Sequence, residues 1–143
     1  MGGFFSNRLE DYPKAIELFE KAIELDPDDA DAYNNMGNAY YYQGDYTKSI
    51  ESYEKAIELD PDNAIAYNNM GFAYFDQGDY TKAIESYEKS IELDPDFADA
   101  YYNMGIAYRD QGNTQLKISN YKKAARLGHQ GAQDWFKKSG HDW

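Results

Sequence analysis

Residues 30–63 read ADAYNNMGNAYYYQGDYTKSIESYEKAIELDPDN, and the chain repeats this stretch at once. Residues 64–97 differ from it at only seven of 34 positions, and residues 98–112 begin a third copy before the similarity fades. A fixed period of this length is typical of one small supersecondary unit that stacks on copies of itself. The sequence therefore predicts an array of repeats rather than one closed core.

Each copy divides into two helical patterns. Apolar and small residues recur at helical spacing over Ala32–Tyr40 and again over Tyr46–Leu59. Between them, Gly44 is placed to end the first helix and Asp45 to cap the second. The second helix is expected to stop at Asp60-Pro61-Asp62, because proline has no N–H to donate and disfavours helix in the residue before it. The predicted unit is therefore a pair of helices joined by tight turns.

Small residues stand where the two helices of a unit must approach each other. Gly37 and Ala56 have little or no side chain, so we expect the rings of Tyr40 and Tyr53 to fill the space beside them. The chain holds 15 tyrosines but only 2 tryptophans, which suggests amphipathic rings packed between helices with their hydroxyls at the edges. One helix pair cannot bury both of its faces, so neighbouring pairs must stack.

The same residue types recur at fixed places in both full copies. The first helix of each copy has an aromatic residue, then Met-Gly, then Tyr. The second helix has a small residue (Ser or Ala), then an aromatic residue, then another small residue, and a Pro follows it. This pattern resembles the tetratricopeptide repeat (TPR) family, with Met in place of Leu and Ser twice in place of Ala. The resemblance covers nearly the whole chain and implies an all-α, right-handed superhelical solenoid of stacked antiparallel helix pairs with a C-terminal capping helix. The residues that carry it are Tyr33, Met36, Gly37, Tyr40, Ser49, Tyr53, Ala56 and Pro61, then Tyr67, Met70, Gly71, Tyr74, Ala83, Tyr87, Ser90 and Pro95.

The repeat register divides the chain into five segments. Residues 1–29 are expected to be a truncated first repeat, mainly its second helix, because residues 11–16 match residues 45–50 and Glu10 replaces the turn glycine. Its amino-terminal end, with Phe4 and Phe5, is expected to be adhesive. Two full repeats follow, then a divergent one, then a capping helix around Gln130–Ser139 and a tail. The remaining boundaries are 30–63, 64–97, 98–128 and 129–143.

The charge of −12 narrows the classes of partner. Residues 1–116 carry a net charge of −16 and residues 117–143 a net charge of +4. An acidic array repels nucleic acids and anionic lipids, whose affinity comes mostly from neutralising phosphates. No apolar stretch approaches the length of a membrane span, and the absence of cysteine is compatible with a reducing compartment. We therefore expect a cytoplasmic protein that binds neither nucleic acid nor membrane.

Nothing in the sequence points to catalysis or to a metal or cofactor site. The only histidines, His129 and His141, lie near the carboxyl end without a suitable nucleophile nearby. The acidic run over residues 26–31 lacks the glycine and the closing glutamate of a calcium loop. The glycines recur as packing and turn residues and form no phosphate loop. We expect no enzyme, no cofactor and no metal.

The differences between the repeats indicate where a partner would bind. Five positions of the first helix vary among the three copies and fall on one face of a helix. In the TPR family that face lines the concave groove, which holds peptides or partner helices. The alternative is surface drift without a ligand, although several of the varied residues are apolar or aromatic. The varied residues are Asp31, Asn34, Asn38, Tyr41 and Tyr42, then Ile65, Asn68, Phe72, Phe75 and Asp76, then Asp99, Tyr102, Ile106, Arg109 and Asp110.

One position on these helices stays polar and constant, as Asn35, Asn69 and Asn103. An amide carries both a donor and an acceptor, so three of them in a row are able to follow a peptide backbone without reading its side chains. The alternative is that they only join neighbouring helices. Three such pairs contribute roughly 0.5–1.5 kcal/mol each, short of the ~8 kcal/mol of micromolar binding. The aromatic residues must supply the rest, and we expect modest affinity.

The best-known TPR site, a carboxylate clamp for chaperone tails, is not expected here. The clamp combines asparagines with lysine and arginine, and its cationic positions are not filled in this sequence. The matching places hold Asn34, Asn38, Asn69, Asp99 and Asn103. The sequence therefore predicts a protein-interaction module for a basic or apolar peptide or helix. A self-assembling array, with homo-oligomers formed through the truncated first repeat, is the alternative.

Overall fold

The computed structural model describes the backbone of residues 2–143 and the side chains of residues 11–143. Over this range the chain forms α-helices joined by short turns, which confirms the predicted all-α class. The helices are α1 (Gly2–Leu25), α2 (Ala30–Tyr42), α3 (Tyr46–Leu59), α4 (Ala64–Asp76), α5 (Tyr80–Leu93), α6 (Ala98–Asp110), α7 (Thr114–Arg126) and α8 (Gln130–Ser139).

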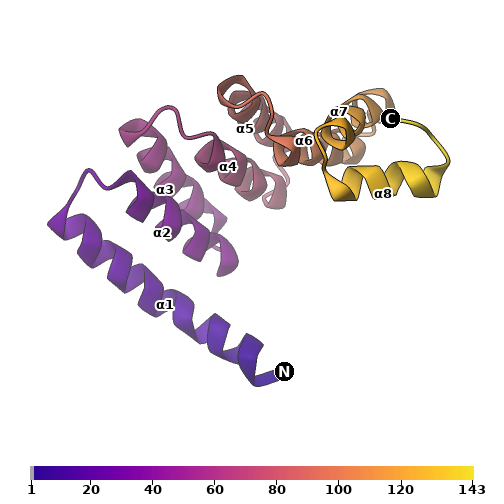
Figure 1. Ribbon diagram of the computed structural model, residues 1–143. Coiled ribbons are helices and arrows are strands. Elements are labelled where there is room, and N and C mark those ends of the chain that lie inside the picture. The colour runs from indigo at the N-terminus through magenta and orange to yellow at the C-terminus, as the bar shows by residue number, and fades with distance from the viewer. Residues whose placement is uncertain (1) are drawn as a thin grey trace.

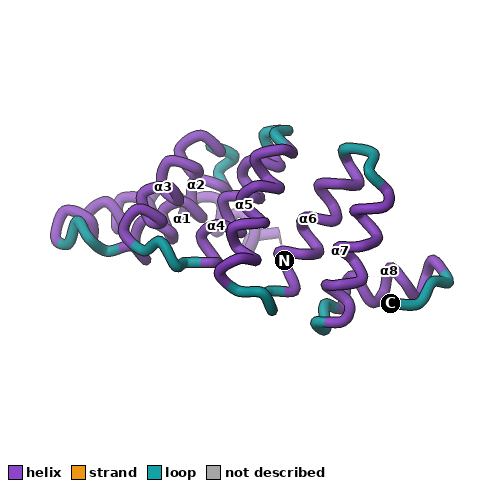
Figure 2. Tube along the Cα trace, turned by 90° about the horizontal axis from the view of Figure 1, so that it is seen from above, coloured by secondary structure: helices purple, strands orange, loops and turns teal. Residues whose placement is uncertain are grey.

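The helices stack in chain order as a solenoid. Within each repeat, α2 packs on α3, α4 on α5 and α6 on α7, and each pair also contacts the next through α3–α4 and α5–α6. Figure 1 shows the pairs following one another along an arc, with α1 at one end and α8 at the other. Contacts also join α2 to α4 and α4 to α6, so the first helices of the repeats form the inner side of the arc. Figure 2 shows the short loops that connect them.

The first helix extends beyond the stretch that matches the second helix of the other repeats. α1 runs without a break from Gly2 to Leu25 and packs on α2. The physical reason is the residue that stands where the other repeats turn. The other repeats turn at a glycine with positive φ, such as Gly44 at +83°, whereas Glu10 favours continued helix. The expected adhesive role of Phe4 and Phe5 lies outside the described side chains.

The turn and cap residues act as the sequence predicted. Asp45 accepts a hydrogen bond from the backbone N–H of Lys48, and Asp79 does the same for Lys82 in the next repeat. These bonds satisfy N–H groups that the first turn of a helix leaves unpaired. The carboxyl-terminal helix α8 also has the predicted bounds.

The core of each repeat is a glycine on the first helix against a buried tyrosine of the second. A β-carbon built on Gly37 would lie 2.6 Å from the Tyr53 ring, far inside a normal carbon contact. Tyr53 itself is only 1% exposed. The same contact recurs between Gly71 and Tyr87. The predicted close approach of the two helices is therefore confirmed, and it depends on the missing side chain.

We predict that Gly37→Ala destabilises the protein by about 1–3 kcal/mol, because the new methyl group overlaps the buried Tyr53 ring. Replacing the ring by a smaller side chain should relieve the overlap. The double variant Gly37→Ala/Tyr53→Leu should therefore lose roughly 1 kcal/mol less stability than the two single variants together. Urea unfolding followed by circular dichroism measures all three.

The turn glycine provides the matched control for this cycle. Gly44→Ala should also destabilise, through its positive φ, but nothing lies within 4 Å of its missing β-carbon. Its effect should therefore simply add to that of Tyr53→Leu. If the losses of stability added equally well in both cycles, the overlap between the methyl group and the ring would not be the cause of the Gly37→Ala effect.

Ionisation of the buried tyrosines should destabilise the protein at alkaline pH. Burial raises the pKa of the Tyr53 and Tyr87 hydroxyls well above their usual value of 10.0. The folded state thus keeps these protons after the unfolded state has lost them, so stability is complete below pH 10 and falls as the pH rises. Tyr53→Phe should make the free energy of unfolding fall less steeply above pH 10, by up to ~1.4 kcal/mol per pH unit. Urea midpoints between pH 8 and pH 11 test this, and equal slopes would contradict it.

Candidate functional site

The inner side of the arc carries two hollows that lie one repeat apart. The first hollow, of about 260 Å³, lies between α2 and α4, and the second, of about 170 Å³, lies mainly between α4 and α6. The first hollow is lined by Asn38, Tyr41, Tyr42, Tyr53, Asn69 and Phe72. The second hollow is lined by Tyr41, Phe72, Phe75, Asp76, Tyr87, Asn103 and Ile106.

The two hollows are built from equivalent positions of successive repeats. Phe72, Phe75 and Asp76 in the second hollow occupy the places of Asn38, Tyr41 and Tyr42 in the first. The first hollow is therefore lined by aromatic rings and two amides, and the second by aromatic rings and Ile106 with one amide and one carboxylate. Most of these residues were singled out from the sequence. The floor tyrosines, Tyr53 and Tyr87, were recognised there only as core residues.

A hydrogen bond connects the first helices of adjacent repeats at the border of the two hollows. The Tyr41 hydroxyl donates to the Asp76 carboxylate at 2.5 Å. Burial and this hydrogen bond both raise the pKa of Tyr41 far above its usual value, so the phenol stays protonated. Tyr42 is 62% exposed and stacks on Tyr12 of α1, which extends the aromatic surface to the first helix.

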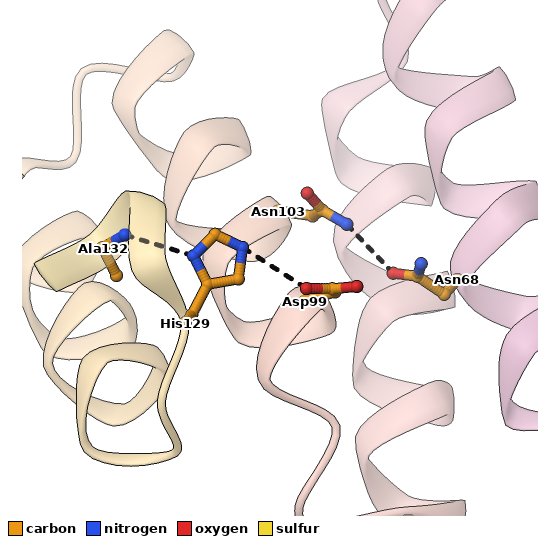
Figure 3. Close-up of polar contacts among 5 residues, drawn as sticks. All are labelled: Asn68, Asp99, Asn103, His129 and Ala132. Carbon is orange, nitrogen blue, oxygen red and sulfur yellow. Dashed lines mark hydrogen bonds and ion pairs between the residues drawn. The ribbon is translucent and has the colours of Figure 1, made fainter. Parts of the chain in front are cut away.

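The three constant asparagines differ in their surroundings. Asn35 is exposed, and Asn69 donates to Asn38 at 3.3 Å. Asn103 is 7% exposed and donates to Asn68 at 3.1 Å, as Figure 3 shows. Both amides of the last pair are buried and bonded to each other, as in the alternative that the constant asparagines join neighbouring helices.

The reason lies in the neighbouring residue of the preceding helix. Asn38 offers an amide oxygen that accepts from both Asn69 and Tyr53. The equivalent place in the next repeat is Phe72, which offers no acceptor, so Asn103 bonds one turn earlier instead. The counterpart of Asn68 in the first repeat is Asn34, whose amide oxygen is buried without a hydrogen-bond partner.

The carboxyl-terminal end of the inner side is closed by His129. Its Nδ1 accepts from the Ala132 N–H at the start of α8, and its Nε2 lies 3.3 Å from an Asp99 oxygen. Figure 3 shows the ring between these two groups. Tyr102 stacks on His129, with ring centroids 4.2 Å apart, and also on Tyr121. Two predicted groove residues, Asp99 and Tyr102, thus help to attach the capping helix, which the sequence did not indicate.

The other predicted site residues lie outside the two hollows. Asp31 and Ile65 are exposed near the amino-terminal ends of α2 and α4. Arg109 and Asp110, at the end of α6, form an exposed ion pair at 2.9 Å. Such a pair contributes little to stability. Its effect is to offset one of the few cationic charges on this side of the array.

Among the described residues, no group of three or more acidic, histidine or cysteine side chains is placed to hold a metal ion. Within the same part of the chain, no helix is both long enough and apolar enough to cross a bilayer.

Comparisons with known proteins identify the repeat. A family model described as TPR repeat matches residues 7–44, 37–78 and 73–112, and one described as tetratricopeptide repeat matches residues 98–127. A crystal structure of MamA superposes with a TM-score of 0.78 at 28% identity, over 92% of this chain and 80% of that one. A second MamA crystal structure gives a TM-score of 0.77 at 34% identity, over 85% and 67% of the two chains. A comparison with curated proteins returned no match.

We predict that replacing each constant asparagine by alanine costs more stability from the first repeat to the third. Asn103→Ala should cost about 1–3 kcal/mol, because it leaves the Asn68 oxygen buried without a donor. Asn69→Ala should cost less, because Asn38 keeps its bond from Tyr53. Asn35→Ala, the exposed control, should stay within about 0.5 kcal/mol of the parent. Urea unfolding measures the three losses of stability. Equal losses would contradict the prediction that the surroundings of each asparagine decide its contribution.

Proposed function

Because the chain belongs to the tetratricopeptide repeat family, we propose that it is a scaffold or adaptor that binds a peptide or helix of a partner protein along its inner side. The observation that carries this proposal is the pair of adjoining hollows. Besides the buried Tyr53 and Tyr87, they are lined by exposed or half-buried aromatic and apolar side chains such as Tyr42, Phe72 and Ile106. Phe72, 37% exposed, lies in both.

The geometry supports a short linear segment rather than a small molecule. The first hollow is lined from the first helices α2 and α4, the second from α2, α4 and α6, and the two hollows share Tyr41 and Phe72. A chain lying across the helices would place successive side chains in them. The second hollow, with Phe75 and Ile106, suits an apolar side chain. Burial of one such side chain contributes about 1.5–3 kcal/mol, so two anchors support modest affinity.

The charge of the array favours a basic or neutral partner. The inner side carries Asp31, Asp76 and Asp110, and Arg109, which also lies there, is paired with the neighbouring carboxylate of Asp110. Negative potential speeds the approach of a cationic segment and opposes an acidic one. A basic or apolar partner therefore remains the better match, as proposed from the sequence.

The proposal predicts that binding depends on the exposed rings of α4. Peptides selected from a random-sequence display library against the full chain should bind the double variant Phe72→Ala/Phe75→Ala roughly ten-fold or more weakly, because two apolar anchors are lost. Fluorescence polarisation with a labelled selected peptide measures the difference. The double variant should keep the helical circular dichroism signal.

Ile65→Ala is the matched control, since Ile65 is exposed on the same helix but lines neither hollow. Its affinity should equal that of the wild type. Unchanged affinity in the Phe72/Phe75 variant, or an equal loss in the Ile65 control, would mean that the hollows do not bind the partner.

A further inference from the structure

We propose that the first hollow holds an arginine side chain of the partner, with its guanidinium against the rings of Tyr41, Tyr42 and Phe72. This inference rests on the proposed function and deepens it, because it assigns a chemical class to one anchor of the bound segment. It is carried by the lining of the hollow and by the charge around it.

The lining is dominated by aromatic rings, whose faces carry negative charge density. Four of the six residues of the first hollow are Tyr or Phe, and the other two are asparagines. Tyr41 and Tyr42 meet edge to face, with ring centroids 5.4 Å apart, so their planes enclose a corner. A cation over such rings is attracted by their quadrupoles, while an anion is repelled. Among the described residues, no lysine or arginine lines either hollow.

The hydrogen bond at the border strengthens this preference. The Tyr41 hydroxyl donates to Asp76, which increases the electron density of the phenol ring and fixes a carboxylate beside the hollow. The surroundings are acidic as well, since the whole chain carries a charge of −12. The Tyr41 ring, the Asp76 carboxylate and the negative net charge all attract a cationic side chain.

The protein uses the same contact within its own chain. Lys48 lies over Tyr40 at 5.5 Å from the ring centroid, and Lys82 over Tyr74 at 5.6 Å, at equivalent places of two repeats. Tyrosine faces of this array therefore accept cations in water-exposed positions. Those contacts are on other faces of α2 and α4 from the hollows.

Arginine fits the hollow better than lysine. A guanidinium is planar, stacks on aromatic faces and offers several N–H donors in one plane, whereas an ammonium is a compact and strongly hydrated charge. Asn69, whose amide nitrogen donates to Asn38, lines the same hollow, and its side-chain oxygen is an acceptor for those donors. The second hollow also combines aromatic rings with an amide and the Asp76 carboxylate. Its amide, Asn103, is buried and bonded to Asn68, and Ile106 adds apolar surface.

The test uses the full chain and three small probes: N-acetylarginine amide, N-acetyllysine amide and N-acetylnorleucine amide. Ring signals of labelled tyrosine and phenylalanine are followed by NMR during titration. We expect saturable shifts for Tyr41, Tyr42 and Phe72, with arginine binding roughly 3- to 30-fold more tightly than norleucine and also more tightly than lysine. Equal affinity for norleucine would mean a merely apolar hollow. Equal affinity for lysine would mean general attraction by the net charge. Either result would overturn the inference.

Variants locate the probe. Tyr42→Ala and Phe72→Ala remove exposed rings and should abolish the preference for arginine over norleucine, whereas Ile65→Ala should leave it unchanged. Tyr41→Phe keeps the ring but loses the bond to Asp76, so it should weaken arginine binding without abolishing it. Survival of the preference in both ring variants would contradict the assignment.

The two proposals fail in distinguishable ways. If selected peptides lose affinity for the Phe72/Phe75 variant but arginine amide gives no shifts, the inner side binds partners and the arginine assignment is wrong. If arginine amide binds as expected but the peptides do not depend on Phe72 and Phe75, the hollow recognises a cation and the proposed function is wrong.

Discussion

Contact between a glycine and a buried tyrosine holds each repeat together and also shapes the surface that partners would meet. Gly37 against Tyr53 allows α2 and α3 to approach until the ring spans the space between them. The ring then reaches the inner side, where its hydroxyl bonds to Asn38 and its edge lines the first hollow. Core and candidate site thus share one side chain, so the floor of the hollow is as rigid as the fold itself.

The fold was predictable because every local signal repeats and agrees with the others. Helical periodicity, the turn glycine Gly44 and the cap Asp45 each specify the same boundaries, and three copies make chance agreement very improbable. The full length of α1 was not specified in advance. Glu10 stands where the other repeats have a turn glycine, and without that glycine the helix extends to Gly2. The contact between His129 and Asp99 could not be predicted from the sequence either, because the distance between these residues depends on how α6 and α8 pack.

The candidate site was predictable in part, because variation between repeats marks more than one kind of position. Phe72 and Tyr42 vary where the surface is open. Ser49 and Ser90 vary as well, each replaced by alanine in the other repeat, yet both are fully buried and donate to backbone carbonyls. The pairing of Asn103 with Asn68 was not predictable from its constant position, because it follows from the absence of an acceptor at Phe72 in the preceding helix.

Shared side chains restrict how such a surface can change its specificity. Phe72 lies in both hollows, and Tyr41 borders both through its bond to Asp76. A substitution at either place therefore alters two neighbouring anchors at once. Asp76 and Tyr42, in contrast, each line a single hollow. We infer that binding preference in this array is tuned most independently at the last position of each first helix, where a tyrosine stands in one repeat and an aspartate in the next two.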